Sequence, residues 1–176
     1  MQSKSRQRGV SLIEVLMAVL IFSIGLIGLA GLLVVSTRSN HTAYLRTQVT
    51  FLANGMAARM SANPAGVWNG DYNSAVYPLP AAAAGCGLAA ACNAAGLATH
   101  DQRMWSNQLR TFLPDPAATI DCTGTASAGY DPTSQLNRRP PYGGTCKMSI
   151  TWTERNDGDQ NNRGAGLRSF AWEFQP

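Results

Sequence analysis

The chain has 176 residues, of which 14% are charged and 45% are hydrophobic, enough for one domain and an appendage. Its formal net charge is +4, but Lys4, Arg6 and Arg8 precede every acidic residue and supply most of this excess. The remainder is nearly neutral, which argues against nucleic acid as a partner of the mature chain. A basic cluster before an apolar run is instead typical of a membrane-orientation signal.

The first predicted element is an apolar helix. No charged residue occurs from Val15 to Val35, and a helix of that length, about 30 Å, crosses one bilayer core. A secretory signal peptide has a shorter apolar core that is followed by a small-residue cleavage site. Here the small residue that fits a cut, Gly9, precedes the run. We therefore expect the apolar helix to remain in the mature protein.

This arrangement resembles the N-terminal signal of type IV pilins and pseudopilins. The chain has a short basic leader that ends in Gly9, then an apolar Val10, then Glu14 at the fifth mature position. The resemblance implies cleavage between Gly9 and Val10 and N-methylation of the new Val10 amine by a prepilin peptidase. Most members have Phe at the position of Val10. The resemblance also implies that Glu14 pairs with the N-terminus of an adjacent subunit during filament assembly.

Elementary electrostatics gives Glu14 the same role. A carboxylate in hydrocarbon is unfavourable by a few kcal/mol unless it has a partner. Cleavage creates a positive amine at Val10, one helical turn from Glu14, so the acid can face this amine or that of a neighbouring subunit. The alternative is an interfacial acid tolerated near headgroups in a simple membrane anchor, which explains neither Gly9 nor the leader.

Glycines recur within the apolar run, at Gly25, Gly28 and Gly31. Small residues allow helices to approach one another closely in lipid. We favour this packing role over the alternative of a segment that stretches or unwinds inside a filament.

The helix is predicted to continue beyond the apolar run with a single apolar stripe. It should end near Asn63, because Pro64 disfavours a helical residue before it and lacks an N–H donor. Val10 to Ala62 then forms one helix of about 80 Å. The stripe recurs at helical spacing and is expected to pack against a domain: Leu45, Val49, Leu52, Met56 and Met60.

Less regular sequence follows the long helix. Residues 64–99 are rich in turn-forming and small residues, and they are predicted to form a loop with at most short helical pieces. A second helix is predicted from Asp101 to Leu113, because Trp105, Leu109 and Phe112 recur at helical spacing before Pro114. Residues 114–146 are predicted to be irregular.

Four cysteines lie after the apolar run: Cys86, Cys92, Cys122 and Cys146. An even number in an exported domain indicates two disulfides. Three pairings are possible, and nearness in the sequence favours Cys86–Cys92 with Cys122–Cys146. A zinc site is the disfavoured alternative, because no C-x-x-C occurs and the two histidines do not have ligand spacing.

Two strands are predicted near the C-terminus. Large apolar residues alternate with smaller or polar ones in both segments, which is typical of half-buried antiparallel strands. Their apolar faces should cover the stripe of the long helix and give an α+β head, the type IV pilin fold that the resemblance implies. The alternating residues are Met148, Ile150 and Trp152, and then Phe170, Trp172 and Phe174.

The C-terminal strands and residues 51–67 also resemble the PilV group of minor pilins. This resemblance implies a protein that joins other minor pilins in a complex that primes pilus assembly. Its implied partners are those minor pilins, the major pilin, the prepilin peptidase and inner-membrane lipid.

The same interpretation divides the chain into four parts. Residues 1–9 are the leader, 10–36 the transmembrane and filament-core helix, 37–63 its amphipathic half, and 64–176 the periplasmic head. The expected location is the bacterial inner membrane, crossed once, with incorporation into the pilus.

Motifs for catalysis or cofactor binding are not found, and we expect no enzyme, cofactor or metal site. Asp157–Asn161 imitates the start of a calcium loop, but Asn162 and Arg168 stand where that loop needs Gly and Glu. Residues 138–144 mix charge with an aromatic and are interpreted as ordinary surface. Two alternatives to a minor pilin stay open: a type II secretion pseudopilin, and a membrane-anchored periplasmic enzyme or binding protein.

Overall fold

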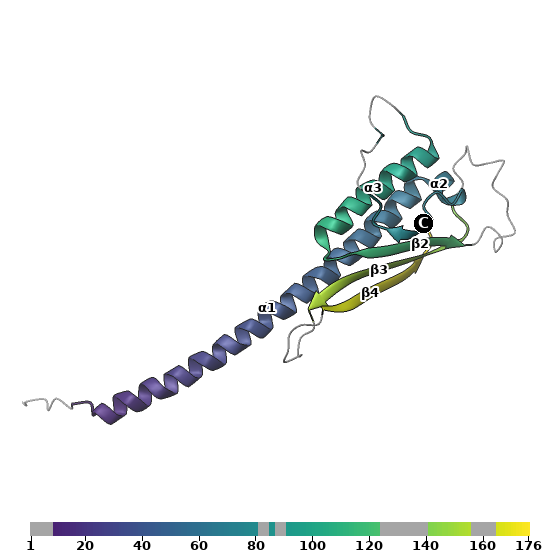
Figure 1. Cartoon of the computed structure of the whole chain (residues 1–176). Helices are drawn as coiled ribbons and strands as arrows, with labels where there is room; N and C mark the ends of the chain where they lie inside the picture. The colour runs from purple at the N-terminus through teal and green to yellow at the C-terminus, as the bar shows by residue number, and fades with distance from the viewer. Residues whose placement is uncertain (1–8, 81–84, 87–90, 124–140, 156–164) are drawn as a thin grey trace, which may run out of the picture. The chain divides into compact units, whose positions relative to one another are not determined.

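The computed structural model describes residues 9–80, 85–86, 91–123, 141–155 and 165–176. The chain forms two compact units, Met1–Ala43 and Tyr44–Pro176. Helix α1 (Leu12–Ala62) begins in the first unit and ends in the second (Figure 1). The second unit, called the head below, also contains α2 (Pro64–Trp68), β1 (Ser74–Tyr77), α3 (Ala94–Phe112), β2 (Ala117–Thr123), β3 (Thr145–Arg155) and β4 (Ala165–Phe174).

The end of the long helix is where the sequence predicts it. Helix α1 ends at Ala62, and Pro64 is the first residue of α2. Proline is favoured there because its missing N–H would have no partner in a first helical turn. The Asn63 side chain caps α2 by accepting a hydrogen bond from the Gly66 backbone N–H at 3.3 Å. One Asn-Pro pair therefore ends one helix and begins the next.

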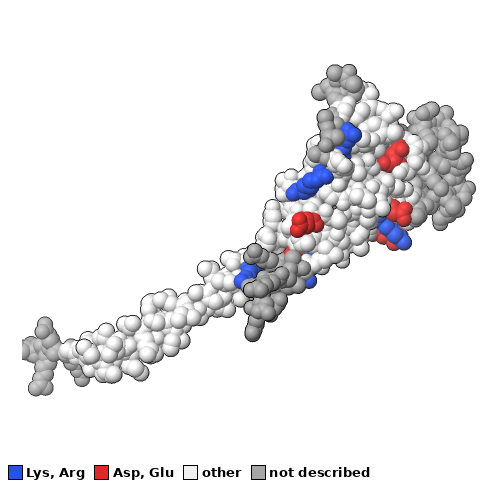
Figure 2. All heavy atoms as spheres, in the orientation of Figure 1, with Lys and Arg blue, Asp and Glu red and all other residues white. Residues whose placement is uncertain are grey.

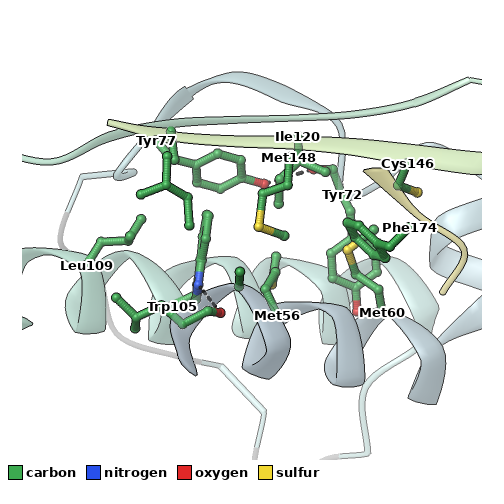
Figure 3. Packing of buried hydrophobic residues seen from close by; sticks show 14 of the residues in the cluster. Met56, Met60, Tyr72, Tyr77, Trp105, Leu109, Ile120, Cys146, Met148 and Phe174 are labelled. Carbon is green, nitrogen blue, oxygen red and sulfur yellow. Dashed lines mark hydrogen bonds between the residues drawn. The ribbon is translucent and has the colours of Figure 1, made fainter. Parts of the chain in front are cut away.

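The predicted apolar stripe of α1 forms the centre of the head. All five of its members are at most 3% exposed, so this prediction is confirmed. Figure 3 shows Met56 of α1 close to Trp105 of α3 and beneath the sheet residue Met148, with Met60 farther along α1 beneath Phe174. The Trp105 indole N–H donates to the Leu52 carbonyl at 3.0 Å, which holds α3 against α1.

The strands form a four-stranded antiparallel sheet in the order β1-β2-β3-β4. Strands β3 and β4 contain the two segments predicted from alternation. The β3 residues Met148, Ile150 and Trp152 are buried; Phe174 of β4 is also buried, and Phe170 is partly buried against the core. The head is thus an α+β structure in which the sheet covers the α1 stripe, and together with the long apolar helix it has a type IV pilin-like fold.

Three predictions about the middle of the chain are wrong. Helix α3 begins at Ala94, within the predicted loop, because Asn93 caps it by accepting from the Gly96 N–H at 2.8 Å. Strand β1 also lies in that loop. Strand β2 lies in the segment predicted to be irregular; of its buried residues Ala118 and Ile120 only Ile120 is large, so the alternation signal is weak.

Candidate functional site

The residues around the predicted cleavage point lie immediately before α1. Gly9 and Val10 precede the helix, and Val10 is 70% exposed. A side-chain atom added at Gly9 would meet no atom within 4 Å. The Gly9–Val10 bond therefore lies in non-helical, exposed backbone.

Glu14 lies in the first turn of α1. Its backbone N–H donates to the Ser11 carbonyl at 3.0 Å, and the Val15 N–H donates to the same carbonyl at 3.3 Å. A negative side chain is favoured at this end of a helix, because the first N–H groups carry partial positive charge. In the described part of the chain the Glu14 side chain is exposed and has no ion-pair partner.

The first part of α1 is long and apolar enough to cross a membrane, with a mean hydropathy of 2.8 and none of its most apolar window buried. Figure 2 shows this stretch without charge on the face in view. The space beside its glycines is empty, because a Cβ added at Gly25, Gly28 or Gly31 would meet no atom within 4 Å. No contact among the described residues of this chain therefore requires these positions to be small.

Both disulfides of the structure have the pairing that nearness in the sequence favours. Cys86 is bonded to Cys92, six residues away, just before α3. Cys122 is bonded to Cys146, its direct partner in the register of β2 and β3. The second bridge therefore joins neighbouring strands, and its Cys146 is fully buried.

The head also contains a buried polar network that sequence analysis missed. The Asp101 carboxylate, on α3, accepts from Arg59 Nη1 at 3.1 Å and from the Tyr72 hydroxyl at 2.9 Å. Asn63 Nδ2 donates to the same tyrosine oxygen at 3.1 Å and to the Ala94 carbonyl at 2.8 Å. The network connects the last turns of α1 to α3 through the turn after α2.

A second set of bonds extends this network. Gln102 Nε2 donates to the Tyr77 hydroxyl at 2.9 Å and to the Asp71 carbonyl at 2.8 Å. The Tyr77 hydroxyl donates in turn to the Tyr72 carbonyl at 2.9 Å. Burial raises the pKa of both tyrosines, and Asp101 beside Tyr72 raises that pKa further. The only sequence signal for the network was the Asn-Pro pair at the end of α1.

The calcium-like segment and the predicted surface segment 138–144 do not form a binding site within the described residues. The calcium-like segment 157–161 and residues 138–140 lie outside the described residues. Tyr142 is buried and packs edge-on against Trp68 at 4.9 Å, so that part of the predicted surface segment belongs to the core. Within the described residues, no group of three or more His, Cys, Asp or Glu side chains is placed to hold a metal ion.

Comparison with known proteins identifies the N-terminal segment. The family model described as the prokaryotic N-terminal methylation motif matches residues 4–30, which include Gly9, Val10 and Glu14. No curated protein and no solved structure was found to match the chain. From residue 4 to residue 30, the chain therefore carries the methylation signal that marks type IV pilins and pseudopilins.

Proposed function

We propose that this protein is a minor pilin of a type IV pilus, a structural component that joins other minor pilins to prime pilus assembly. The observation that carries the proposal is the methylation motif, followed by an exposed apolar helix that leads into a disulfide-bonded α+β head. The PilV-like character of residues 51–67 and of the C-terminal strands supports the assignment to minor pilins.

The proposal assigns a role to each part of the chain. A prepilin peptidase removes residues 1–9 and methylates Val10. Residues 10–36 anchor the protein in the inner membrane with a single pass and later pack in the filament core, where Glu14 meets the amine of an adjacent subunit. Residues 37–63 connect this anchor to the periplasmic head of residues 64–176. The head contacts other minor pilins and the major pilin, and its role is structural rather than catalytic.

A type II secretion pseudopilin is the second candidate, because the methylation motif is common to both classes. Deletion of the gene distinguishes them: loss of surface pili with normal secretion supports the minor pilin, whereas loss of secretion with normal pili supports the pseudopilin.

Mass spectrometry of the mature N-terminus tests both candidates against a simple membrane anchor. We expect the chain to begin at Val10 and to carry one added methyl group when it is produced with an active prepilin peptidase. Without the peptidase it should retain Met1 or Gln2 and the basic leader. A mature protein with an intact leader in the presence of the active peptidase would overturn the proposal.

A further inference from the structure

The head contains a cavity that the proposed function does not use. It has a volume of about 340 Å³ and lies between α1, at residues 46–50, and the strands β3 and β4. Arg46 and Val49 of α1 line one side, and Trp152 of β3 lines another, with Arg168 and Phe170 of β4. Trp152 and Arg168 are direct partners in the strand register, so their side chains share the face of the sheet that covers α1.

Near the cavity, β3 contains two buried polar atoms that have no hydrogen-bond partner in the described part of the chain. Trp152 is 3% exposed, and its indole N–H has no acceptor. Glu154, two residues on, is 7% exposed; its Oε2 accepts from Arg168 Nε at 3.2 Å, whereas its Oε1 has no donor. Buried polar groups in native proteins nearly always have partners, so the unpaired indole N–H of Trp152, a residue that lines the cavity, indicates a bound acceptor.

The charges at the cavity favour an anion. Arg46 is exposed and forms no ion pair with any described residue. Arg168 binds Glu154 through Nε, and its terminal nitrogens bind none of the described residues. The lining thus contains two guanidinium groups and no carboxylate, and Glu154, which pairs with Arg168, offsets one of the two charges. Guanidinium groups bind carboxylates through paired, charge-assisted hydrogen bonds.

We propose that this cavity is a docking site for an acidic side chain of a partner protein. The carboxylate lies between Arg46 and Arg168 and accepts the Trp152 indole N–H, and its methylene groups contact the apolar walls formed by Val49 and Phe170. Those walls favour a carboxylate on a short hydrocarbon stem over a fully polar anion such as phosphate. The inference concerns the head alone and does not depend on the filament role.

The test uses the full chain, labelled with ¹⁵N, in micelles of an uncharged detergent. The indole N–H signal of Trp152 is identified by its absence in Trp152→Phe. We expect this signal to shift saturably on addition of the blocked tripeptide acetyl-Gly-Glu-Gly-amide. The Gln counterpart of the peptide should leave it unchanged. The Trp105 indole N–H, which already donates to Leu52, is the internal reference and should not move.

Matched variants test the arginine role. Arg46→Gln should weaken the binding of the Glu peptide about tenfold, the usual effect of losing a hydrogen bond to a charged group. Lys147→Gln removes one positive charge from an exposed position of β3, the strand that contains Trp152, and should leave binding unchanged. An unshifted Trp152 signal, an equal shift with the Gln peptide or with sodium chloride at matched ionic strength, or equal binding by Arg46→Gln would each overturn the proposal.

Discussion

At the residue scale, the role of Glu14 is an electrostatic question. The acid lies at the start of a helix whose next twenty or so residues are uncharged. The partial positive charge of the helix end stabilises the carboxylate by only ~1 kcal/mol, which is a small part of the cost of placing it in an apolar environment. No described residue of the chain pairs with it. In the proposed filament, the positive partner of Glu14 is a Val10 amine created by cleavage, that of its own chain or that of an adjacent subunit.

We accordingly expect Glu14→Ala to insert into the inner membrane in normal amounts but to be depleted at least about tenfold from sheared pili, because a buried charge-assisted contact is lost. Immunoblots of membrane and sheared fractions measure both quantities. Glu173→Ala, which removes an exposed acid from the head, is the matched control and should assemble normally. Recovery of Glu14→Ala in pili at the level of the control would contradict the pairing role.

At the scale of elements, the two disulfides constrain different parts of the head. Cys122–Cys146 joins adjacent strands across 24 residues of sequence, whereas Cys86–Cys92 closes a short loop before α3. In the chain-entropy description, the longer loop restricts the unfolded chain more. The strand bridge should therefore contribute more to the stability of the folded head.

Replacing Cys122 and Cys146 together by serine should lower the free energy of unfolding by about 3 kcal/mol. The double variant Cys86→Ser/Cys92→Ser serves as the comparison, and its loss should be about 1 kcal/mol smaller. Urea unfolding in detergent, followed by tryptophan fluorescence, measures both. An equal loss, or a larger one for the short loop, would show that strain or residual structure outweighs loop length.

At the scale of the whole molecule, the buried network connects all the helices of the head to one another. Asp101 and Asn63 bring the end of α1, the turn after α2 and the middle of α3 to one tyrosine hydroxyl. Tyr77 then extends the network towards the sheet. Because such a network must be complete to be favourable, it fixes one arrangement of these elements.

The network predicts loss of stability in alkali. The pKa values of Tyr72 and Tyr77 are raised in the folded head by burial, from about 10 in the unfolded chain. Between the unfolded and folded pKa values the unfolded chain has lost protons that the folded head retains, so stability is complete below pH about 10 and falls as the pH rises above it.

Urea unfolding across the range from pH about 8 to about 11 measures this slope, and phenolate absorbance should rise together with unfolding. Tyr77→Phe removes one of the two phenols, so its stability should decline less steeply with pH than that of the wild type. A wild-type stability that stays constant above pH 10 would contradict the prediction.

The sequence by itself determined the features that depend on neighbours a few residues apart. Helical spacing identified the α1 stripe, Pro64 marked the end of α1, strict alternation identified β3 and β4, and the order Gly9, Val10, Glu14 identified the methylation signal. Each of these signals is repeated or fixed in position along the chain, so it can be recognised without knowledge of distant contacts.

Only the tertiary structure decided the features that join distant segments. Strand β2 exists because β1 and β3 supply its hydrogen bonds, and its own small residues give little pattern. Asp101 meets Arg59 across 42 residues, and the cavity brings Arg46 beside Trp152 and Arg168. The physical reason is that the energy of such a contact depends on which residues surround it in the folded structure, and the local sequence does not specify those residues.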